Sequence, residues 1–124
     1  MAEQRGCICE GGLTLIFPCS GAADVGEISD RAARRLAKTG QGKMYCLAGI
    51  GGRVNDILVN TRAATTILAI DGCDADCAKH TLELAGFAEF KHLRLTALGL
   101  EKGKAPANGV NINRAVTGAT ELRK

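Results

Sequence analysis

Cysteine is the residue type in this 124-residue chain whose number and placement suggest chemistry. The six cysteines are Cys7, Cys9, Cys19, Cys46, Cys73 and Cys77. The N-terminal segment that contains the first two, MAEQRGCICEGG, lacks the apolar stretch of a signal peptide, so we expect a cytoplasmic protein with reduced thiols. In a reducing compartment, six cysteines indicate metal ligands or reactive thiols rather than a disulfide framework.

Composition narrows the classes of partner. The chain is 46% hydrophobic and 23% charged, which predicts a globular domain with an ordinary core. Aromatic residues make up only 3% of the chain, so it lacks the stacking surfaces that a single-stranded nucleic-acid platform needs. No apolar run is long enough for a membrane span. We therefore expect neither a nucleic acid nor a membrane as partner; the sequence identifies no protein partner, and a homodimer stays open.

Four apolar segments predict the strands that would position the cysteines, at residues 13–17, 43–47, 65–70 and 90–98. The first three are nearly continuous and predict buried strands, whereas the fourth alternates and predicts an edge strand. Helical periodicity falls between them, at residues 22–38, 53–61 and 74–85. This order predicts an α/β fold: a small open, mainly parallel four-stranded sheet with helices on both faces, a Rossmann- or flavodoxin-like three-layer arrangement.

We expect a single domain over residues 1–124. Its core would run from about residue 13 to residue 102, after a flexible arm at 1–12. The polar, Gly- and Asn-rich tail at 103–124 could close with a short helix at 111–122.

Four of the six cysteines fall where the predicted strands end. Cys19 follows the first strand, Cys46 lies at the end of the second, and Cys73 follows the third. Cys77 comes four residues later, one turn into the next helix. The carboxyl ends of parallel strands share one edge of the sheet, and ligands bind there. The sequence therefore predicts that these four sulfurs converge in one site.

The chemistry expected of four neighbouring thiolates is metal binding. Their mutual repulsion requires a cation, and four cysteines around Zn²⁺ are the common solution in a reducing cytosol. Helix amino termini near Cys19, Cys73 and Cys77 would lower the pKa of these thiols. An iron–sulfur cluster uses the same number of ligands and stays an alternative.

Other polar residues near the strand ends have structural interpretations. Asp71 could accept backbone N–H bonds that shape the turn, or anchor a cysteine-bearing loop. His80 and His92 are interpreted as surface histidines rather than ligands. The GIGG segment at 49–52 lacks the Lys-Ser/Thr of a phosphate-binding loop, so turn glycines are favoured and no nucleotide cofactor is expected.

The segments PCSGA (18–22), GKMYCLAGIGG (42–52), AIDGC (69–73) and LGLEK (98–102) together resemble the DGC-domain family. The resemblance covers about residues 13–102 and includes the Asp71-Gly72-Cys73 motif that names the family. It implies that the four characteristic cysteines, here Cys19, Cys46, Cys73 and Cys77, bind zinc. It implies no biochemical role and assigns no catalytic residue.

Three functions remain to be separated. The first is a zinc-binding module, structural or regulatory, because four protein ligands leave no open coordination position. The second is a thiol-based carrier or enzyme for sulfur, selenium or a thiophilic metalloid such as arsenic, with a nucleophile such as Cys73. The third is an iron–sulfur protein. A hydrolase is disfavoured because no Ser–His–Asp set or carboxylate pair lies beside the strand ends.

Overall fold

The computed structural model describes residues 13–123. The elements in this part of the chain are β1 (Thr14–Pro18), α1 (Asp24–Lys38), β2 (Lys43–Met44), α2 (Leu47–Gly51), α3 (Asn55–Ala63), β3 (Thr66–Asp71), α4 (Cys77–Leu84), β4 (Lys91–Arg94), the 3-10 helix η2 (Leu95–Leu98) and α5 (Gly109–Arg123). Strands and helices alternate through most of this order, which confirms the predicted α/β fold.

The four strands form one open sheet in the order β2-β1-β3-β4, and every neighbouring pair is parallel. The chain moves from β1 to β2 on one side and then returns to place β3 on the other side of β1. The boundary between β1 and β3 is therefore the topological switch point, where open α/β sheets bind ligands beyond the carboxyl ends of their strands.

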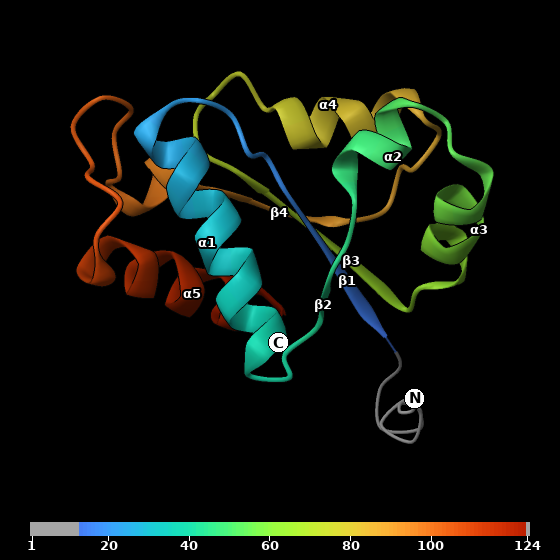
Figure 1. Ribbon diagram of the computed structural model, residues 1–124, viewed down its shortest axis with the longest axis horizontal. Coiled ribbons are helices and arrows are strands. Elements are labelled where there is room, and N and C mark those ends of the chain that lie inside the picture. The colour runs from blue at the N-terminus through green and yellow to red at the C-terminus, as the bar shows by residue number, and fades with distance from the viewer. Residues whose placement is uncertain (1–12, 124) are drawn as a thin grey trace.

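Helices cover both faces of the sheet (Figure 1). On one face, α1 and α5 pack over Ile16, Leu68 and Ile70. On the other face, α2 and α4 pack over Leu15 and Phe17, and α3 adds partly buried residues. The alternation of adjacent residues between the two cores is what a strand buried on both sides requires. The predicted three-layer arrangement is confirmed.

Both edge strands are shorter than predicted. β2 has only two residues, and neither is fully buried, so the prediction of a buried strand at 43–47 was wrong. After one further ladder bond, from Tyr45 N to Ile16 O at 2.8 Å, the chain turns into α2, a helix that periodicity did not predict. β4 is the predicted edge strand, but it ends at Arg94 and residues 95–98 form η2.

The C-terminal segment forms a helix of 15 residues that packs against the sheet. Ile112, Ala115 and Ala119 of α5 belong to the same core as α1, so the core includes residues beyond 102. Asp24, the first residue of α1, connects α1 to the loop that precedes α5. Its carboxylate accepts bonds from the backbone N–H groups of Gly103 and Ala105 in that loop. Among the described residues, none of the helices is long and apolar enough to cross a membrane.

Candidate functional site

The switch point between β1 and β3 holds the first predicted site residue. The backbone N–H of Cys19 donates to Ile70 O at 2.8 Å, which extends the β1–β3 ladder by one residue. The Cys19 Sγ then accepts a bond from the backbone N–H of Gly72 at 3.2 Å. Because Gly72 directly precedes Cys73, this bond connects the segments that carry two of the four cysteines.

Gly72 allows the amino terminus of α1 to approach the turn after β3. A Cβ on Gly72 would lie 2.7 Å from the backbone carbonyl carbon of Val25, closer than real Cβ atoms come to backbone. Ser29, one turn further along α1, is buried and donates its hydroxyl to Ile70 O at 2.9 Å. The end of β3 is therefore fixed against α1 by close packing and by a buried hydrogen bond.

The other two predicted ligands lie at helix starts and are exposed. Cys46 is the N-cap of α2, and its Sγ accepts a bond from the backbone N–H of Gly49 at 3.3 Å. Cys77 is the first residue of α4. Cys19 and Cys73 are half-buried. All four thiols are free, and they follow the carboxyl ends of three parallel strands, so they share one edge of the sheet.

The four thiols do not form a closed tetrahedron. Among the described residues, no three cysteine sulfurs lie within 4.8 Å of one another, whereas Zn–S bonds of about 2.3 Å bring tetrahedral sulfurs to roughly 3.8 Å apart. One reason is that Cys19 packs against the α2–α4 core while Cys73 packs against the α1–α5 core. The donor chemistry fits zinc, and binding would require these side chains to turn toward a common centre. Cys7 and Cys9 lie outside the described residues.

The expectation of a lowered pKa was wrong for Cys19. Burial raises the pKa of this thiol above its ordinary value, because a thiolate loses hydration there. The bond from Gly72 and a contact with Ser29 act in the opposite direction but do not outweigh burial. In the metal-free protein Cys19 is therefore a protonated thiol at neutral pH.

Asp71, the last residue of β3, fixes the start of α4. Its carboxylate is 1% exposed and accepts bonds from the backbone N–H groups of Ala78 at 2.7 Å and Lys79 at 3.0 Å. These are amides in the first turn of α4, which have no partner within the helix. The expectation that Asp71 accepts backbone N–H bonds is confirmed.

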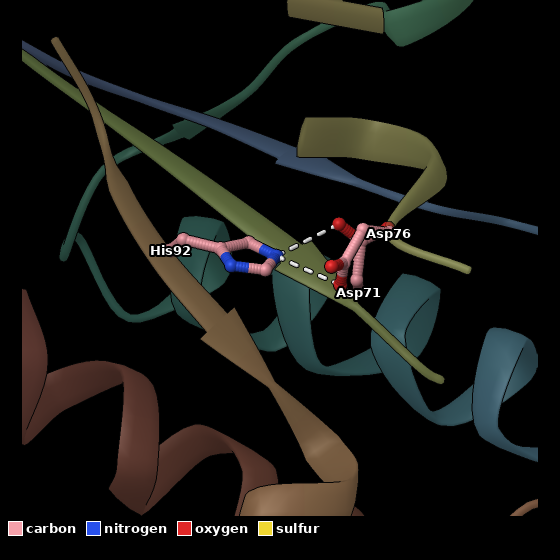
Figure 2. Close-up of side chains that lie close together, drawn as sticks. All are labelled: Asp71, Asp76 and His92. Atoms are coloured by element: carbon pink, nitrogen blue, oxygen red, sulfur yellow. Dashed lines mark hydrogen bonds and ion pairs between the residues drawn. The ribbon is translucent and has the colours of Figure 1, made fainter. Parts of the chain in front are cut away.

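His92 was missed as a partner of this group. Figure 2 shows its imidazole facing both carboxylates: Nε2 lies 2.9 Å from Asp71 Oδ2 and 3.6 Å from Asp76 Oδ1. The side chain of His92 is only 20% exposed. A carboxylate can only accept, so the hydrogen on Nε2 points toward Asp71. The interpretation of His92 as a surface histidine was wrong, whereas His80 is exposed and pairs with Glu83.

Asp76 joins the same group from the position before Cys77. It is 6% exposed and has a left-handed backbone with φ of 54°, which is uncommon outside glycine. Both of its carboxylate oxygens accept bonds from the Arg94 guanidinium. This bonding is the main reason that the pKa of Asp76 lies below its ordinary value. The chain thus adopts a strained conformation where an Arg–carboxylate pair holds it.

Asp71, Asp76 and His92 have ligand atoms within 4.8 Å of one another, but their bonding does not suit a cation. Asp71 is occupied by two amides, and Asp76 faces the positive charge of Arg94. The group is therefore a hydrogen-bonded anchor. The alternating pattern of residues 90–98 already placed His92 and Arg94 on one face of a strand. It did not predict that this face meets Asp71.

The chain matches a known protein family over most of its length. The DGC domain family model matches residues 15–118, which is most of the chain. This chain belongs to the DGC domain family. It is 36% identical over 90 residues to the "Anaerobic and virulence modulator AnvM" of Pseudomonas aeruginosa, and the match covers 73% of this chain and 69% of that protein. No solved structure matches the chain.

The three residues that name the DGC domain have separate structural roles here. Asp71 binds the first turn of α4, Gly72 permits close contact with α1, and Cys73 follows in the turn. Membership of the family supports a metal-binding role for the chain.

A cavity of about 550 Å³ opens beside Cys46. Its walls come from the end of β1, the β2–α2 junction and α1, and include Pro18, Met44 and Leu47. Asp30 and Arg34, which form an ion pair at 2.7 Å, border it from α1. The volume lies within the range of small-molecule sites.

Proposed function

We propose that this protein binds one zinc ion through the thiolates of Cys19, Cys46, Cys73 and Cys77. The observation that carries the proposal is the bond from Gly72 N–H to Cys19 Sγ, which joins the β1 and β3 ends at the switch point. Cys46 follows the neighbouring strand, and Cys77 begins the helix after Cys73. Four soft donors at one sheet edge match the ligand preference of zinc.

A closed set of four cysteine ligands would make zinc a cross-link rather than a Lewis acid, because no coordination position is left for water. The ion would then connect the ends of β1, β2 and β3 with α4. Each thiol that enters the site as a thiolate releases its proton, so zinc affinity falls as the pH is lowered. The raised pKa of Cys19 extends this dependence to higher pH.

Elemental analysis of protein purified without oxygen tests the proposal. We expect one zinc and no iron per chain, and a lower unfolding temperature after chelation. Protein with no zinc, which also unfolds at the same temperature with and without a chelator, would contradict it. Stoichiometric iron with a coloured preparation would favour the iron–sulfur alternative instead.

A thiol carrier or enzyme is the second candidate, and the cavity beside exposed Cys46 favours it. Arsenite offers a defined test, because each thiol that condenses with As(OH)₃ forms one S–As bond and releases one water. Mass spectrometry of the metal-free protein would detect the adduct and locate it. An adduct centred on Cys46 in zinc-free protein would support this candidate, and the absence of any adduct would remove it.

A further inference from the structure

The turn between β3 and α4, residues 71–76, is called the DGC turn below. Side chains of the neighbouring strand β4 hold it at both ends. Asp71 at one end contacts His92, and Asp76 at the other end contacts Arg94. Cys73 lies between these ends, and Cys77 directly follows the second. The segment that supplies two of the four cysteines is therefore attached to β4 by two separate contacts.

The register of β3 and β4 makes this attachment possible. Asp71 pairs with Arg94, and Ala69 pairs with His92. His92 and Arg94 are two residues apart, so their side chains emerge on the same face of the strand. That face also carries α4, whose first turn bonds to Asp71. Figure 2 shows the imidazole pointing from β4 toward both carboxylates.

The energetics favour a fixed geometry at these two points. Asp71 and Asp76 are almost completely buried, and an unpaired buried carboxylate is costly, so losing a partner disfavours the present arrangement. Asp76 also has a left-handed backbone, which persists only where surrounding contacts hold it. The pair with Arg94 is the side-chain contact that acts here, beside backbone bonds from Asp76 N–H to Cys73 O and from His80 N–H to Asp76 O.

We infer that His92 and Arg94 are positioning residues, which act through Asp71 and Asp76 to fix the Cys77 end of the DGC turn for metal binding. This inference rests on the proposed zinc site. The two ends of this turn are held by β4, so within the turn itself only the segment around Cys73 would have to rearrange for metal binding. Preorganisation of this kind lowers the free-energy cost of gathering the ligands.

The test compares His92→Ala with His80→Ala, since these are the only two histidines and His80 is exposed on α4. The first readout is amide hydrogen exchange of Ala78 and Lys79 in the metal-free proteins. We expect exchange about tenfold faster or more in His92→Ala, because loosening Asp71 weakens bonds to a charged acceptor. His80→Ala should leave both amides unchanged.

The second readout is zinc affinity, measured by competition with a chelator. Loss of a partner that orients a ligand segment weakens metal binding roughly 10- to 100-fold, and we expect this for His92→Ala and Arg94→Met. His92→Gln, whose amide N–H can still donate to Asp71, should recover most of the affinity. This rescue separates positioning from general destabilisation, and it covers the case in which His92→Ala does not fold.

The outcomes are distinguishable. Wild-type protein without zinc affinity overturns the proposed function, and the role of the β4 contacts in it. Wild-type affinity in both His92→Ala and Arg94→Met overturns the inference alone. Unchanged exchange of Ala78 and Lys79 in His92→Ala also overturns it.

Discussion

The Sγ of Cys19 accepts a hydrogen bond from the backbone N–H of Gly72 at 3.2 Å, across the boundary between β1 and β3. This bond brings the residue after one central strand against the turn after the other. The same turn packs on α1, because Gly72 has no side chain to keep Val25 away. The packing of the turn and the placement of Cys73 therefore depend on each other.

Gly72→Ala should destabilise the protein by about 1–3 kcal/mol, as expected when a methyl group is forced into a packed site. Its Cβ would lie 2.7 Å from backbone that cannot easily move. Gly21→Ala is the matched control, because a Cβ there has nothing within 4 Å and the backbone is not left-handed. Urea denaturation of both variants measures the difference, and equal midpoints would contradict this packing.

Cys19 should be alkylated more slowly than Cys46 and Cys77 in reduced, metal-free protein. Iodoacetamide reacts with the thiolate, and Cys19 combines a raised pKa with burial, while the other two are exposed. Because its pKa lies above the ordinary 9.0, its rate should still be rising with pH above about pH 9. Timed alkylation with peptide mass spectrometry gives the order; Cys19 reacting first would refute it.

The C-terminal helix should be required for stability. Ile112 is 2% exposed, and its replacement by alanine should cost about 2–5 kcal/mol through lost burial and a residual cavity. Val110, two residues earlier on the same helix, is 69% exposed, so Val110→Ala should change the free energy of unfolding little. Chemical denaturation compares the two variants. A negligible effect of Ile112→Ala would show that α5 does not pack as described.

Acid should weaken the connection between α1 and the loop before α5. The amides of Gly103 and Ala105 are the main reason that the pKa of Asp24 lies below its ordinary 3.8. A lowered folded-state pKa contributes stability that is fully present above about pH 3.8 and is lost as the pH falls through the folded value. Asp24→Asn should therefore be less stable than wild type near pH 7, and the two should converge at low pH. Urea midpoints across this range measure the convergence; a constant difference would argue against it.

The fold could be predicted where the sequence carries strong periodicity. β1 and β3 are continuous apolar runs, and both were located within one residue. α2 could not be predicted, because a five-residue segment with two glycines has low helix propensity. Tertiary contacts form it instead: Ile50 is completely buried, and Gly49 lies so close to Ile57 that a Cβ would approach to 2.1 Å.

The edge of the sheet that carries the cysteines could also be predicted, because strand ends fix where Cys19, Cys46 and Cys73 leave the sheet, whereas the predicted convergence of the four sulfurs is not shown. The hydrogen-bonded anchor, in which His92 and Arg94 of β4 contact Asp71 and Asp76, could not be predicted. Its existence depends on the register of β3 against β4, which pairs Asp71 with Arg94 and which no local pattern specifies. The raised pKa of Cys19 likewise depends on burial between layers rather than on its place near a helix start.

The most direct test of the central claim is the zinc content of the wild type and five variants purified without oxygen. Four carry the single changes Cys19→Ser, Cys46→Ser, Cys73→Ser and Cys77→Ser, and the fifth carries Cys7→Ser with Cys9→Ser. The four-thiolate account predicts one zinc per chain in the wild type and the double variant, and loss of zinc in all four single variants. Full zinc retention in any single variant, or loss of zinc in the double variant, would contradict the proposed ligand set.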